Sequence, residues 1–71
     1  MEESRKERFK RLATARTKAV LDKLRLLGNL SNRANYDYSE EEVRKIFRAI
    51  DEQLRVIKAK FSGSTKREFK L

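Results

Sequence analysis

The sequence predicts an all-α fold: a two-helix antiparallel hairpin, two copies of which pair into a four-helix bundle. Apolar residues recur at helical spacing in two segments, at about residues 5–27 and 40–61. The chain has no proline and only two glycines, and neither glycine lies inside these segments. With 71 residues, of which 42% are charged, it makes one small domain at most. We therefore expect a disordered N-terminus (residues 1–4), a helical hairpin domain (residues 5–61) and a flexible basic tail (residues 62–71).

The first predicted helix has an apolar face that basic residues interrupt. Wrapped at about 100° per residue, one face collects seven apolar side chains: Phe9, Leu12, Ala13, Ala19, Val20, Leu24 and Leu27. Gly28, followed by Asn29, is a typical C-terminal stop. Arg16 and Lys23 fall inside the apolar face. Their aliphatic stems can lie along it while the charged heads reach water, or Arg16 can meet an acidic group at a subunit seam.

The charge of the chain is concentrated in the same helix. Between residues 5 and 25 there are nine basic residues and two acidic ones, within a chain of net charge +8. A field of this strength indicates a polyanion or an acidic partner. Five basic residues are expected to lie away from the apolar face and to serve as phosphate contacts: Arg5, Arg8, Arg11, Lys18 and Arg25. Such contacts add affinity and salt sensitivity but carry no sequence information.

The connection over residues 28–38 is rich in asparagine and tyrosine. Asparagine bonds readily to its own backbone, which predicts a compact, self-bonded loop with a tyrosine folded onto the helix ends. The same residue types also bond to base edges and stack on bases when they point outwards. The second interpretation makes four loop residues candidate nucleic-acid contacts: Asn32, Arg33, Asn35 and Tyr36.

The second predicted helix shows the clearer pattern. Its apolar residues follow a 4-3-4-3-4 spacing, typical of a helix that packs on other helices: Val43, Phe47, Ile50, Leu54, Ile57 and Phe61. Ser39 and Glu42 have the spacing of a capping box, with Tyr38 and Val43 at the positions of a hydrophobic staple. Gly63 is placed to end the helix. Three pairs of opposite charge stand four residues apart: Glu40 with Arg44, Glu41 with Lys45, and Asp51 with Arg55.

A single hairpin would leave much of both apolar faces exposed. Exposed apolar surface of this extent usually marks an interface. Pairing two hairpins would cover both faces, so we expect a homodimer. Alternatively, a larger protein or a ribonucleoprotein particle supplies the missing half of the core.

Catalysis, metal binding and cofactor binding are not expected. The chain has no cysteine and no histidine, and no glycine-rich phosphate loop. The acidic run at residues 40–42 is explained by the positive end of the helix dipole. No segment has the roughly 20 apolar residues of a membrane span, and no apolar leader follows the N-terminus. We expect a soluble, cytoplasmic protein that is not an enzyme.

The leading hypothesis is a small basic nucleic-acid-binding protein, an accessory or regulatory factor that contacts phosphates through its first helix. The sequence does not decide between DNA and RNA, and the long connection does not match a helix-turn-helix. The alternative is a protein-interaction module or regulatory subunit that docks on an acidic surface of a larger complex. A membrane-surface helix and a stable bundle without a polyanion partner are weaker alternatives.

Overall fold

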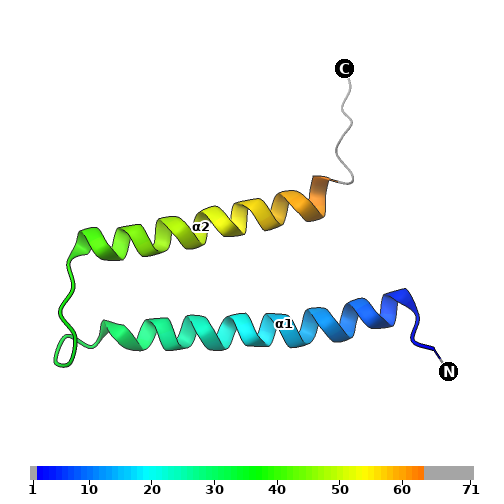
Figure 1. Ribbon diagram of the computed structural model, residues 1–71, viewed down its shortest axis with the longest axis horizontal. Helices are drawn as coiled ribbons and strands as arrows, with labels where there is room; N and C mark the ends of the chain where they lie inside the picture. The colour runs from blue at the N-terminus through cyan, green and yellow to red at the C-terminus, as the bar shows by residue number, and fades with distance from the viewer. Residues whose placement is uncertain (1, 64–71) are drawn as a thin grey trace, which may run out of the picture. The chain divides into compact units, whose positions relative to one another are not determined.

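A computed structural model describes residues 2–63, which form two α-helices and a short 3₁₀ turn and contain no strand (Figure 1). Helix α1 spans Arg5–Gly28, the turn η1 spans Asn29–Ser31, and α2 spans Glu40–Gly63. The all-α prediction is confirmed. Both helices begin at the predicted residue, and they end one and two residues later than predicted. Met1 and residues 64–71 of the predicted tail lie outside the described residues.

The chain divides into two structural units between Asp37 and Tyr38, and each unit is described by itself. The first contains α1, η1 and the loop, and the second contains α2. Each α-helix has 24 residues, which at about 1.5 Å per residue gives a length of about 36 Å. No residue within 2–63 is buried. The apolar faces of both helices are therefore available for contact.

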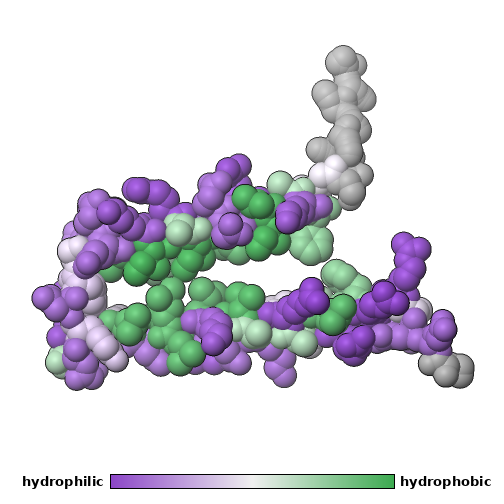
Figure 2. Space-filling view, viewed as in Figure 1, coloured by the Kyte–Doolittle hydropathy of each residue, from purple (hydrophilic) through white to green (hydrophobic). Residues whose placement is uncertain are grey.

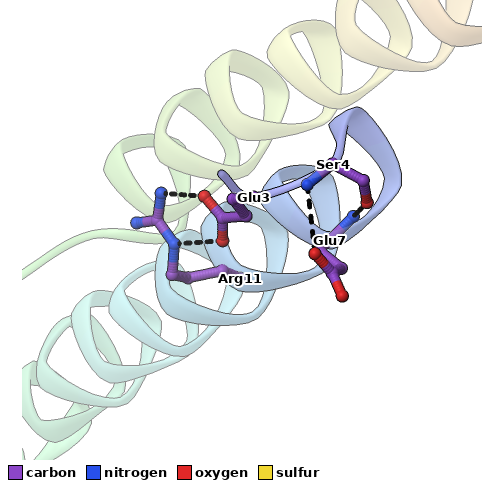
Figure 3. A network of polar contacts seen from close by, with 4 residues as sticks. All are labelled: Glu3, Ser4, Glu7 and Arg11. Carbon is purple, nitrogen blue, oxygen red and sulfur yellow. Dashed lines mark hydrogen bonds and ion pairs between the residues drawn. The ribbon is translucent and has the colours of Figure 1, made fainter. Parts of the chain in front are cut away.

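A capping box that the sequence analysis did not identify begins α1. The backbone N–H of Glu7 donates to Ser4 Oγ at 3.0 Å, and the N–H of Ser4 donates to Glu7 Oε1 at 3.0 Å (Figure 3). The Ser4 carbonyl accepts the N–H of Arg8 at 2.9 Å. These bonds satisfy donors that the first turn of a helix otherwise leaves unpaired. They fix the start of α1 and the direction of the residues before it.

At the other end, α1 includes Gly28, which was predicted to follow it, and then tightens into a 3₁₀ turn. Gly28 keeps right-handed helical angles (φ −61°, ψ −28°). The N–H of Asn29 donates to carbonyls of the last turn, those of Arg25, Leu26 and Leu27. A helix end of this kind satisfies its last carbonyls without a left-handed residue, and no residue in the described part of the chain has a positive φ.

The loop after η1 bonds to itself around Asn32, as the first of the two interpretations predicted. The Asn32 carbonyl accepts the N–H groups of Asn35 (3.1 Å) and Tyr36 (3.0 Å). Its side-chain Oδ1 accepts the N–H of Ala34 at 3.0 Å, which makes an Asx turn. Tyr38 is half-buried, whereas 48% of the Tyr36 surface is exposed. The loop therefore has a defined local structure and presents Tyr36 to solvent.

Helix α2 begins with the predicted capping box. The N–H of Ser39 donates to Glu42 Oε1 at 2.8 Å, and the N–H of Glu42 donates to Ser39 Oγ at 3.1 Å. Tyr38 and Val43, the predicted staple positions, are both half-buried. The cap and the half-buried pair locate the start of α2.

Only one of the three predicted ion pairs of α2 forms. Arg44 lies 4.0 Å from Glu40, and it lies closer to Glu41, at 3.2 Å. Arg55 pairs with Glu52, three residues earlier, instead of Asp51. Both i,i+3 and i,i+4 neighbours are within reach on a helix surface, so spacing alone does not select the partner.

We expect Ser39→Ala to destabilise α2 by about 1 kcal/mol, because the side-chain acceptor of the capping box is lost and the Glu42 N–H keeps no side-chain partner. The measurement is the loss of helical circular dichroism on heating. Ser39→Asp is the matched control, since aspartate caps as well as serine. Equal losses in the two variants would contradict a capping role for Ser39.

Candidate nucleic-acid interface

Three of the predicted phosphate contacts form one row along α1. Arg11, Lys18 and Arg25 are seven residues apart, so successive side chains are displaced by about 10.5 Å along the axis and by only about 20° around it. All three are exposed. This basic row, which we define as Arg11, Lys18 and Arg25, lies on the side of α1 opposite Phe9 and Leu27. It presents three positive charges along about 21 Å of helix.

Arg11 is held by a carboxylate from the residues that precede α1. Its Nε donates to Glu3 Oε2 at 2.8 Å and its Nη2 donates to Glu3 Oε1 at 2.9 Å (Figure 3). The hydrogen bond from Arg11 lowers the pKa of Glu3, and the same bond raises the pKa of Arg11; in both cases desolvation opposes the change. Two parallel N–H···O bonds are the geometry with which arginine also binds phosphate.

The other two members of the row differ from each other. Arg25 Nη1 lies 2.7 Å from Asp22 Oδ1, one turn earlier on α1. Lys18 has no carboxylate within ion-pair distance in the described part of the chain. The row therefore has an unpaired ammonium at its centre and a paired guanidinium at each end. Surface pairs of this kind are weak and exchange readily with other anions.

The remaining basic residues of α1 lie elsewhere. Contrary to the expectation that it would lie away from the apolar face, Arg5 is one turn before Phe9, which places it at the N-terminal end of that face and outside the basic row. Arg8 stands one turn before Leu12, at the border of that face. Both are exposed and lie near the positive end of the helix dipole. They can contact a polyanion that extends past the N-terminal end of α1.

The candidate loop contacts belong to the same structural unit as the basic row. Asn32, Arg33, Asn35 and Tyr36 are exposed and follow the C-terminal end of α1. The side-chain oxygen of Asn32 is occupied by the Asx turn, so this residue organises the loop. Asn35 and Tyr36 give their backbone N–H groups to the turn and keep their side chains at the surface.

Arg16 and Lys23 are exposed and interrupt the apolar face of α1. Neither makes an ion pair within the part of the chain that the structure describes. As a result α1 is less amphipathic than α2. Figure 2 shows the same contrast: the apolar surface of α1 gathers towards its C-terminal half, and its N-terminal half is mostly hydrophilic.

The apolar face of α2 is a continuous band along the helix (Figure 2). Its large side chains are substantially exposed, with 53% of Phe47 and 45% of Leu54 accessible. We define the α2 stripe by the six residues of the 4-3-4-3-4 spacing: Val43, Phe47, Ile50, Leu54, Ile57 and Phe61. An exposed stripe of this length on a helix indicates contact with another helix or another chain.

Two features of the site were missed from the sequence. The Ser4–Glu7 capping box has the same S-x-x-E signature that identified Ser39 and Glu42, so it could have been found. The Glu3–Arg11 pair spans eight residues and crosses the start of α1. Helical spacing rules do not cover such a pair, because they apply only inside a helix.

No group of three or more acidic residues within 2–63 is arranged to hold a metal ion. Neither described helix is long and apolar enough to cross a membrane. No protein-family model, curated protein or solved structure matches the chain.

Proposed function

We propose that this chain is a small nucleic-acid-binding protein, an accessory or regulatory factor that contacts phosphates through the basic row of α1. The observation that carries the proposal is the row itself: Arg11, Lys18 and Arg25 are exposed and aligned on the side away from the apolar face. The net charge of about +7 over residues 5–25 supports it. A cytoplasmic location, expected from the sequence, is part of this proposal.

The dimensions of the basic row suit a linear polyanion. Duplex DNA carries one negative charge per about 1.7 Å of axis, so a row of about 21 Å runs past about a dozen charges. Arginine and lysine side chains are long and flexible, so each can reach one of several neighbouring phosphates. Contacts of this kind give affinity, and they depend strongly on salt because bound counterions are released.

The loop would add contacts to bases. Tyr36 is exposed enough to stack on an unpaired base, and Asn35 and Arg33 carry groups that bond to base edges. Stacking on unpaired bases is typical of single-stranded RNA recognition. The loop thus extends the basic row past the C-terminal end of α1 with residues of a different chemistry.

The same proposal includes an assembly in which α1 and α2 form an antiparallel hairpin and two hairpins pair into a four-helix bundle. It is supported by the absence of any buried residue within 2–63 and by the exposed α2 stripe. Pairing would bury apolar surface that costs free energy in water. Two copies would also present two basic rows, which doubles the number of phosphate contacts.

The second candidate function is a protein-interaction module that docks on an acidic surface of a larger complex. The exposed α2 stripe favours it, because an apolar helix face can lie in the groove of a partner. The basic row of α1 would then steer association with an acidic protein. The two candidates differ in the main binding surface, which is the basic row in the first and the α2 stripe in the second. They also differ in the partner, which is a nucleic acid in the first and an acidic protein in the second.

Fluorescence anisotropy with random-sequence duplex DNA and single-stranded RNA, at about 50 and 200 mM salt, tests the proposal. We expect micromolar or tighter binding at the lower salt. Three phosphate contacts would weaken it about 40-fold at the higher salt, and six contacts, from two basic rows, about 2,000-fold. The size of the loss therefore also reports the number of rows. Absence of binding at 50 mM salt would contradict the proposal and favour an acidic protein as partner.

A further inference from the structure

The two ends of the basic row are neutralised by carboxylates of the same chain, and the pair at Arg11 is the more specific one. Asp22 reaches Arg25 as an ordinary i,i+3 neighbour on α1. Glu3 comes from outside the helix and uses both of its oxygens on Arg11. These bonds occupy the Nε–Nη2 edge of the guanidinium and offset its charge, while the Nη1–Nη2 edge keeps its donors.

We infer that Glu3 is an intramolecular competitor for phosphate, which occupies the Nε–Nη2 edge of the Arg11 guanidinium until a nucleic acid displaces it. The inference rests on the proposed function and adds a residue that sets its affinity. Glu3 carboxylate and a phosphate present similar pairs of oxygens, so one guanidinium face binds one or the other.

The capping box places the competitor. Ser4 has extended backbone angles (φ −71°, ψ 165°), and its backbone N–H and its hydroxyl oxygen are both bonded to Glu7. The residue before it is thereby directed along the first two turns of α1, where Arg11 lies (Figure 3). A tethered carboxylate competes at a high effective concentration. Glu2 is adjacent in sequence and exposed, and it forms no ion pair with any residue of the described range 2–63.

The Glu3–Arg11 pair lowers the affinity for nucleic acid without preventing binding. The Arg11 side chain remains 61% exposed and that of Glu3 33% exposed. Exposed pairs of this type contribute little, so their removal is expected to change an affinity about two- to fivefold. The hydrogen bond between the two side chains lowers the pKa of Glu3 and raises the pKa of Arg11, so it favours the charged form of both.

The experiment compares Glu3→Gln with Glu2→Gln, which change the net charge equally. Binding to random-sequence duplex DNA and single-stranded RNA is measured by anisotropy, for both variants in the wild-type chain and in Arg11→Gln. We expect Glu3→Gln to bind about two- to fivefold more tightly than Glu2→Gln, and we expect this difference to disappear when Arg11 is replaced. Circular dichroism checks that the Ser4 cap and α1 persist in each variant.

Equal affinities of Glu3→Gln and Glu2→Gln would overturn the inference, as would a difference that persists in Arg11→Gln, because the effect would then not pass through Arg11. In either case measurable binding by the wild-type chain would leave the proposed function standing. A wild-type chain that binds neither nucleic acid would overturn the proposed function and the competitor role together.

Discussion

Replacement of the whole basic row, with Arg11→Gln, Lys18→Gln and Arg25→Gln combined, is expected to weaken nucleic-acid binding about 500-fold at 0.1 M salt for each copy of the chain that binds. The estimate follows from counterion release, since each lost phosphate contact removes about 0.9 from the slope of log affinity against log salt, or about eightfold in affinity at that salt. The slope itself should fall by about 2.7 for each copy of the chain that binds. Glutamine keeps a helix propensity close to that of the residues it replaces, so α1 should remain folded.

A second triple variant separates the row from net charge alone. Lys45→Gln, Arg48→Gln and Lys60→Gln remove the same three charges from the polar surface of α2. None of these three residues forms an ion pair within residues 2–63. If binding uses the row, this variant keeps most of the salt slope. A similar loss in both triple variants would show that the charge acts diffusely and that the alignment of Arg11, Lys18 and Arg25 carries no function.

The helices could be predicted from the sequence because their signals are local. The spacing of the α2 stripe, the Ser39–Glu42 box and the position of Gly28 each act over one or two turns. The self-bonded loop followed from the chemistry of asparagine, and the Asx turn at Asn32 is an example of that rule. Features that depend on neighbours within a few residues are therefore within reach of sequence reasoning.

Side-chain partners were predicted less well, for two physical reasons. On a helix, positions three and four residues apart are both neighbours, so Arg55 pairs with Glu52, three residues away, although Asp51, four residues away, is also within reach. Across a helix start, the partner depends on the path of the chain before the cap. Glu3 reaches Arg11 because the bonded Ser4 directs it there, and no spacing rule contains that information.

The candidate site is likewise only partly determined by sequence. The charge of α1 and the register of Arg11, Lys18 and Arg25 follow from composition and helical period. Whether each of these side chains is ion-paired does not follow from them: Arg11 and Arg25 are paired with carboxylates, and within residues 2–63 Lys18 is not. The partner of the α2 stripe depends on surfaces beyond one chain, since an apolar helix face accepts a helix of its own chain, a second copy or another protein.

Leu54→Asp is expected to abolish self-association of the chain. Leu54 stands near the middle of the α2 stripe, and in the proposed bundle it would be buried against other helices. Removal of a buried leucine costs about 2–5 kcal/mol, and a carboxylate placed in the same site adds a desolvation cost. A dimer contains the substitution twice, so its dissociation constant should rise by at least about 10³-fold. Sedimentation equilibrium measures the change directly.

Ala59→Asp is the matched control, because it adds the same charge to α2 on the side away from the stripe. This variant should remain dimeric. The pair also connects assembly to binding: a monomeric Leu54→Asp chain has one basic row instead of two, so its salt slope should be half that of Ala59→Asp. A wild-type chain that is monomeric at every concentration would contradict the four-helix bundle. A helix of the same chain or another protein would then be left as the partner of the exposed stripe.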